Sequence, residues 1–142
     1  MQLLSDVNVL LALVSARHMA HEEVRIWWES TPSTDMLAVP RPVQTSLLRL
    51  LCTRAVMGED TLSLPRAWSV YATLLASGRF AMALESPGLD GEWERLCRPF
   101  GASPKVVMDA YLAAFALTGG YSLVTLDRAF KQFPSLSCVF PA

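Results

Sequence analysis

Asp6 and Asp109 are acidic residues embedded in apolar sequence. Asp6 is the only charged side chain before Arg17, and Asp109 is the only one between Lys105 and Asp127. An ionised carboxylate in apolar surroundings is costly, or takes up a proton, unless a cation or hydrogen-bond donors compensate it. These two acids are therefore the first candidates for a functional site.

Short apolar runs alternate with segments of helical spacing along the chain. Strands are predicted over residues 2–5, 36–39, 80–84 and 122–125, and helices over 8–14, 21–30, 43–54, 68–75, 91–100 and 104–118. Such alternation predicts an α/β fold in which helices cover both faces of a mostly parallel sheet of four to five strands. We expect a single domain over residues 1–142.

The predicted topology brings three acids together. Asp6 follows the first strand, Asp127 follows the strand at 122–125, and Asp109 lies about one turn into the preceding helix. Ligand sites of open parallel sheets collect outside the carboxyl ends of the strands. Three carboxylates at one place repel each other, and a hard divalent cation removes that repulsion. Oxygen ligands favour Mg²⁺ or Mn²⁺ over zinc.

The composition permits a nucleic-acid substrate. The chain has 142 residues, of which 52% are hydrophobic and 18% charged, which is too apolar for a disordered chain. The formal charge of −1 argues against a strongly basic nucleic-acid clamp. If three acids hold a metal ion, the twelve basic residues face ten remaining acids, a balance of +2. Ten of the twelve are arginine, which suits bidentate phosphate contacts.

Neither long apolar stretch is predicted to span a membrane. The first contains Asp6, and the second contains Asp109 and is interrupted by a Gly-Gly pair. Neither stretch has the pattern of a signal peptide. The three cysteines are isolated, without a C-x-x-C pair, and predict neither a zinc site nor a disulfide framework. We therefore expect a cytoplasmic protein.

Several motifs occur in an order that points to one family. The segments LLSDVNVLLAL, SLLRLLCTR, VVMDAYLAAFAL, SLVTLDRAF and KQFPSLSCVF together resemble the PIN-domain ribonucleases of the VapC toxin type, from Met1 to Phe140. The resemblance implies a PIN-like three-layer α/β/α fold and an endoribonuclease dependent on Mg²⁺ or Mn²⁺. It implies that Asp6, Asp109 and Asp127 are both catalytic and metal-binding. It further implies an RNA substrate, a small antitoxin as partner, and a homodimer.

Two positions depart from the family pattern. Ser46 stands where PIN domains usually have a glutamate just before the leucine-rich segment of the middle helix. Ala129 stands where the family often has another acid, two residues after Asp127. The missing glutamate leaves the site one carboxylate short, so we expect weaker metal binding than at a four-acid site. It also supports an alternative, a non-catalytic PIN-fold module that only binds partners.

Two other α/β classes share an acid after the first strand. A phosphoryl-transfer domain of the haloacid-dehalogenase type normally has D-x-D there, whereas this chain has Asp6-Val7-Asn8. A response-regulator receiver has an acidic pair near the first strand, a central phosphorylatable aspartate and a late lysine, which do not line up here.

A local acidic cluster is predicted to be solvated surface because of its Pro, Gly and helix-start context. It comprises Glu85, Asp90, Glu92 and Glu94.

Overall fold

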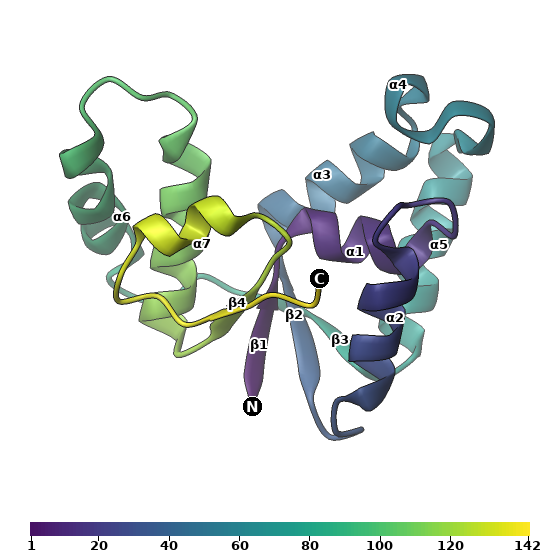
Figure 1. Cartoon of the computed structure of the whole chain (residues 1–142), viewed down its shortest axis with the longest axis horizontal. Helices are drawn as coiled ribbons and strands as arrows, with labels where there is room; N and C mark the ends of the chain where they lie inside the picture. The colour runs from purple at the N-terminus through teal and green to yellow at the C-terminus, as the bar shows by residue number, and fades with distance from the viewer.

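The computed structural model describes residues 1–142 and is built on one parallel sheet of five strands (Figure 1). The spatial order of the strands is β3-β2-β1-β4-β5, and every neighbouring pair is parallel. The strands are β1 (Gln2–Ser5), β2 (Met36–Pro40), β3 (Phe80–Ala83), β4 (Ser122–Val124) and β5 (Cys138–Val139).

Helices cover both faces of the sheet. The α-helices are α1 (Val7–Val14), α2 (His21–Ser30), α3 (Arg41–Leu51), α4 (Arg54–Met57), α5 (Leu64–Ala76), α6 (Leu89–Cys97) and α7 (Val106–Gly119). Short 3₁₀ helices are η1 (Gly58–Asp60), η2 (Arg98–Phe100) and η3 (Arg128–Gln132). Figure 1 shows α6 and α7 on one side of the sheet and α1, α2, α3 and α5 on the other. The predicted three-layer α/β/α architecture is confirmed.

The direction of strand addition reverses beside β1. The chain moves from β1 to β2 and β3 on one side, then returns to place β4 and β5 on the other. Because parallel crossovers are right-handed, this reversal puts the helices before and after it on opposite faces. The carboxyl ends of β1 and β4 therefore form a topological switch point, where open α/β sheets bind ligands.

The α7 helix is the central helix of its layer. Residues 110–116 are buried without interruption, and the helix packs against α6 and β4. A helix that is apolar on every side is stable only when it is enclosed in this way. The sheet is buried from both faces as well: Leu3, Leu4 and Leu123 are at most 2% exposed. No helix is long and apolar enough to cross a membrane.

The start of α7 differs from the prediction. Residues 103–105 form a turn in which the Val106 amide donates to the Ser103 carbonyl (3.1 Å), and the Ser103 side chain caps nothing. The helix therefore begins at Val106 and not at residue 104. It ends as predicted near the Gly-Gly pair, with Gly120 in the left-handed region (φ 73°).

Other boundaries also differ from the predictions: α5 begins at Leu64 and not at residue 68, and α6 spans Leu89–Cys97 and not 91–100. α3 begins at Arg41 and ends at Leu51, whereas the prediction was 43–54. Pro42 is accommodated in the first turn, where its missing amide hydrogen costs no hydrogen bond. The strand β5 was missed because two residues carry no periodic signal.

Candidate functional site

Asp6 lies where β1 ends and α1 begins. Its backbone is extended, and its side chain caps the helix: Oδ1 accepts from the Val7 amide at 2.7 Å. Oδ2 accepts from the Thr125 hydroxyl at 2.7 Å and from the Asn8 side-chain amide at 3.2 Å. The residue is only 8% exposed. The apolar surroundings predicted for this acid are therefore real, and three donors compensate part of its charge.

Thr125 and Asn8 join the ends of β1 and β4. Besides donating to Asp6, the fully buried Thr125 hydroxyl accepts from the Asp127 amide at 3.0 Å. Asn8 accepts from the Leu126 amide at 3.1 Å through its Oδ1. These bonds tie the two strand ends together and orient the Asp6 carboxylate.

Asp109 lies in the first turn of α7, half-buried. Its carboxylate accepts no hydrogen bond from any side chain or backbone amide. Burial raises the pKa of Asp109, and the negative charges of Asp127 and Asp6 raise it further. Burial also raises the pKa of Asp6, against the effect of its hydrogen bonds, and Asp127 adds to the rise. Asp109 is therefore within electrostatic reach of both other acids, and Asp6 within reach of Asp127, around a crevice at the carboxyl ends of β1 and β4.

Asp127 is more exposed than the other two acids. It precedes η3, and its Oδ1 accepts from the Ala129 amide at 2.9 Å, so it caps this short helix. Asp127 therefore has a structural role as a helix cap, whatever its role in a metal site. Its Oδ2 accepts no hydrogen bond, which leaves one oxygen available to a ligand.

The free oxygens of these acids suit a hard divalent cation. Asp109 has two, Asp127 has Oδ2, and Oδ1 of Asp6 has one lone pair beyond its bond to Val7. All are carboxylate oxygens, the donors that Mg²⁺ and Mn²⁺ prefer. No group of three or more His, Cys, Asp or Glu side chains is arranged closely enough to hold a metal ion without movement. Ionised carboxylates repel each other, so a bound cation would be needed to bring the three closer.

Ser46 faces the same place as Asp6. The two residues line a small cavity of about 50 Å³ with Met108 and Leu112. The Ser46 hydroxyl is half-buried and makes no hydrogen bond with another protein group. The position expected to carry a glutamate therefore does point into the crevice. The cavity is large enough for about one ordered water.

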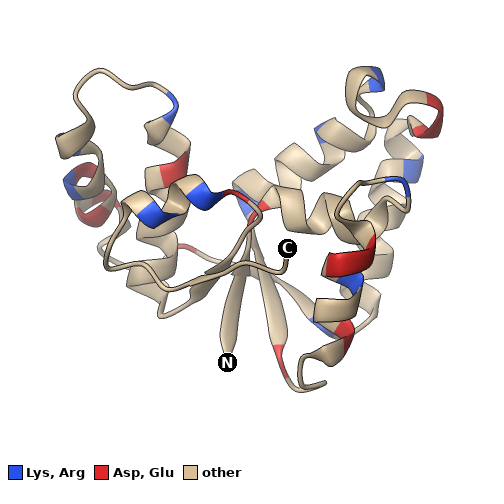
Figure 2. Ribbon diagram, in the orientation of Figure 1, with Lys and Arg blue, Asp and Glu red and all other residues tan.

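Arginines without acidic partners surround the crevice. Figure 2 shows acidic segments where the central strands end and basic segments on the elements around them. Arg41 begins α3 directly after β2, Arg49 follows on the same helix, and Arg128 comes directly after Asp127. None of these three makes an ion pair. The arginines that do are Arg17, Arg25, Arg95 and Arg98. Arg41 donates to the Gln44 side chain and Arg128 to the Ala142 carbonyl, so both are held by neutral acceptors and their charges are not neutralised.

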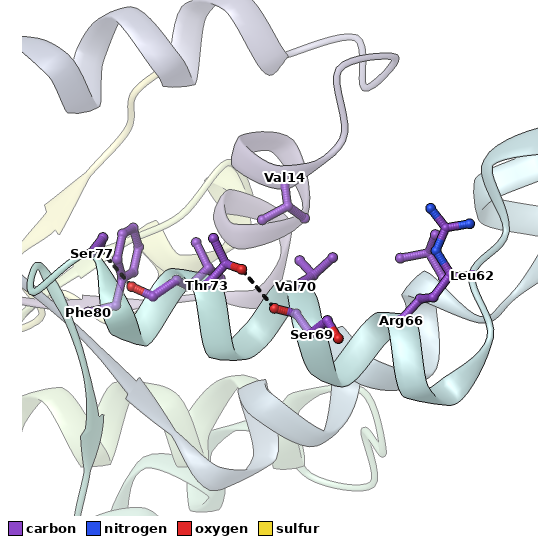
Figure 3. A pocket seen from close by; sticks show the side chains of 9 residues that line it. Val14, Leu62, Arg66, Ser69, Val70, Thr73, Ser77 and Phe80 are labelled. Atoms are coloured by element: carbon purple, nitrogen blue, oxygen red, sulfur yellow. Dashed lines mark hydrogen bonds between the residues drawn. The ribbon is translucent and has the colours of Figure 1, made fainter.

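An apolar groove lies along α5, away from the acids. Val14, Val70, Leu74 and Phe80 line it. Figure 3 shows the side chains of Val14 and Val70 directed toward each other between α1 and α5. Its only charged residue is Arg66. The groove offers neither a metal ligand nor a general base, so it is not a catalytic site.

One polar pair near the crevice had no signal in the sequence. The buried Tyr111 hydroxyl donates to Glu85 at 2.8 Å, across a separation of 26 residues. Glu85 is exposed, as predicted for the acidic cluster, but its carboxylate is held by a core residue. Only the packing of α7 against the segment after β3 brings the two together.

The fold and the acids at its switch point define a family. Residues 3–136 match the model of the PIN domain, so the chain belongs to the PIN-domain family. Ribonuclease VapC41 of Mycobacterium tuberculosis is 42% identical over 135 residues, which are 92% of each chain. Ribonuclease VapC25 of the same species is 32% identical over 141 residues, 97% of each chain.

Solved structures share the fold. VapBC2 from Rickettsia felis, bound to a DNA fragment from its promoter, matches with a TM-score of 0.74 over 99% of this chain and 98% of that one, at 16% identity. VapC20 of Mycobacterium tuberculosis, a Sarcin-Ricin loop cleaving toxin, matches with a TM-score of 0.67 over 92% and 94%, at 17% identity. The predicted family and PIN-like fold are confirmed. The match to the PIN-domain family excludes the dehalogenase and receiver alternatives.

Proposed function

We propose that this protein is a ribonuclease dependent on Mg²⁺ or Mn²⁺, the toxin of a toxin–antitoxin pair. Asp6, Asp109 and Asp127 are its proposed catalytic residues and metal ligands. The observation that carries the proposal is Asp109, a half-buried carboxylate without a hydrogen-bond donor, beside two further acids that raise its pKa. A bound cation would compensate all three at once. The relatives named as ribonucleases, which match along nearly the whole chain, support the same activity.

The roles of the residues follow from their contacts. When bound, a divalent cation supplies the charge that activates an attacking water and offsets the charge developing on the phosphate. Asp6 would hold it in a fixed orientation, because Thr125, Asn8 and the helix amide restrain its carboxylate. Asp109 would approach from α7 on the other face of the sheet.

Ser46 would complete the opposite wall of the crevice. Its free hydroxyl can hold a water molecule in the cavity that it shares with Asp6, but it contributes no negative charge. We therefore expect the cation to bind more weakly than at a four-carboxylate site. A chain that binds no cation would be a PIN module that retains only partner binding.

The test is RNA hydrolysis by the purified protein. We expect structured RNA to be cleaved with Mg²⁺ or Mn²⁺, but not with EDTA, and cleavage to be lost in Asp6→Asn. Asp90→Asn, an exposed acid on α6, is the control and should cleave normally. Metal-dependent cleavage that survives Asp6→Asn would contradict the assignment of Asp6 to the catalytic metal site. Absence of cleavage with either metal favours the binding module.

The proposed partner is a small antitoxin, and the proposed assembly is a homodimer in the cytoplasm. The toxin–antitoxin complexes among the structural neighbours support this partner class. The groove along α5 provides an apolar surface on which an antitoxin segment would bury hydrophobic side chains, with an acid opposite Arg66 (Figure 3). Sedimentation of the free chain measures the dimer, and a chain that stays monomeric at micromolar concentration contradicts it.

A further inference from the structure

A second cavity adjoins the acidic crevice. Its volume is about 630 Å³, and it lies at the carboxyl end of β3, between the segment after that strand and the helices α6 and α7. Pro42 lines both this cavity and the small one that contains Asp6 and Ser46. A substrate held at the acids therefore has this cavity directly beside it.

One wall of the cavity carries an oriented carboxylate. The Tyr111 hydroxyl, in a residue only 5% exposed, donates to Oε1 of Glu85 at 2.8 Å. No hydrogen bond is made to Oε2, and Glu85 makes no ion pair. A buried tyrosine thus fixes an exposed carboxylate that still has accepting capacity.

An aromatic residue forms the neighbouring wall. The half-buried Trp93 donates its indole N–H to the Val107 carbonyl at 2.8 Å, which fixes the ring. Its centroid lies 5.0 Å from that of Tyr111, at an interplanar angle of 73°. The Met82 side chain adds apolar surface. A flat, apolar ligand with hydrogen-bond donors along one edge suits these walls.

Arg41 supplies the positive charge of the cavity. It lines the same space but forms no ion pair with Glu85. The cavity therefore keeps a cation and an anion apart. A phosphate would be attracted to Arg41 and repelled by Glu85, so Glu85 suits a ligand part that donates hydrogen bonds and carries no negative charge.

We propose that this cavity binds a guanine base of the RNA, next to the phosphate that is cleaved. Guanine is the base that presents two adjacent N–H donors on its Watson–Crick edge, which match the free capacity of the Glu85 carboxylate. Trp93 contacts the base, and Arg41 binds a flanking phosphate. The inference rests on the proposed ribonuclease function and makes Glu85 a specificity-determining residue for it.

A basic side chain of a protein partner is the other ligand that suits a carboxylate beside aromatic rings. Arg41 disfavours it, because a second cation would enter a cavity that already contains one. The two positive charges would repel each other, whereas a nucleotide satisfies both Arg41 and Glu85.

The experiment is a titration of the metal-free protein with mononucleotides, followed through the indole N–H signal of Trp93 by NMR. The chain has four tryptophans, and Trp93→Phe assigns the signal. We expect 5′-GMP to shift it with a dissociation constant about ten-fold below that of 5′-IMP, which lacks the 2-amino group. 5′-UMP should bind no better than 5′-IMP.

Glu85→Gln should abolish the preference for 5′-GMP over 5′-IMP. Glu94→Gln, another exposed glutamate, should keep it. The proposal is overturned if no nucleotide shifts Trp93, if both nucleotides bind equally, or if the preference survives Glu85→Gln. It is also overturned if N-acetylarginine amide shifts Trp93 more strongly than 5′-GMP. Because the titration contains neither RNA nor metal, its outcome is separate from a failure of RNA cleavage.

Discussion

Replacing Thr125 with valine should destabilise the protein by removing one hydroxyl from the centre of the crevice. Valine has nearly the same shape, so the main loss is polar. The Thr125 hydroxyl donates to the buried Asp6 carboxylate at 2.7 Å and accepts from the Asp127 amide at 3.0 Å. Hydrogen bonds to charged groups contribute about 1.5–3 kcal/mol and neutral ones about 0.5–1.5 kcal/mol. We expect Thr125→Val to lower the free energy of unfolding by about 2–4 kcal/mol near neutral pH.

Thr125→Ser is the matched control. Serine keeps the hydroxyl and loses one methyl group, which is equivalent to about 0.8 kcal/mol of burial. Urea unfolding in EDTA measures both variants. With a slope of about 2 kcal/mol/M, the valine variant should lose about 1–2 M in its midpoint.

The effect of Thr125→Val should also depend on pH. The hydrogen bond lowers the pKa of Asp6, so it favours the ionised carboxylate over the protonated one. Once acid protonates Asp6 in both proteins, the difference in stability should shrink to about 1 kcal/mol, the size of a neutral hydrogen bond. Equal losses for the valine and serine variants, or a loss that is the same at all pH values, would refute this reasoning.

Three further predictions concern the crevice and the backbone. The pKa of Asp109 is raised in the folded, metal-free protein, so the stability that this carboxyl contributes is present below its unfolded pKa and is lost as pH rises through its folded pKa. Asp109→Asn should therefore be more stable than wild type in EDTA at pH 7. A lower melting temperature of the variant by calorimetry would contradict this. Ser46→Glu should tighten Mn²⁺ binding about ten-fold and destabilise the metal-free protein, whereas Ser46→Gln should do neither. Equal Mn²⁺ affinities for the two variants in titration calorimetry would contradict the placement of Ser46 at the metal site. Gly120→Ala should lower the free energy of unfolding by about 1–2 kcal/mol because the φ angle of Gly120 is +73°. Gly91→Ala, inside α6 with open space around it, should raise it by about 0.5–1 kcal/mol. Urea unfolding that reverses this order would contradict the conformations assigned to the two glycines.

The positions of Asp6 and Asp109 were predictable because they depend on local patterns. An apolar run ending at an acid and followed by a leucine-rich segment places Asp6 at a strand-to-helix junction. The apolar surroundings of Asp109 required a buried helix, and α7 is buried along most of its length. Their convergence followed from the parallel topology alone. Their role as metal ligands stays a prediction.

Contacts across long separations were not predictable in this way. The bond between Tyr111 and Glu85 depends on how α7 packs against the segment after β3, which no periodicity encodes. The start of α7 was wrong because Ser103-Pro104 has the pattern of a helix N-terminus, whereas the chain forms a turn there first. Local patterns thus determined where elements and acids lie, but not which side chains meet.

Direct titration of the metal-free protein with Mn²⁺ tests most simply whether these acids form a metal site. Calorimetry should detect binding to the wild type at millimolar concentrations or below, and the same Mn²⁺ should raise its melting temperature. Asp109→Asn should bind at least about ten-fold more weakly, because it removes the only acid of the three with both oxygens free. Asp90→Asn should bind like the wild type. Equal Mn²⁺ affinity and equal thermal shifts for wild type and Asp109→Asn would contradict the proposed site.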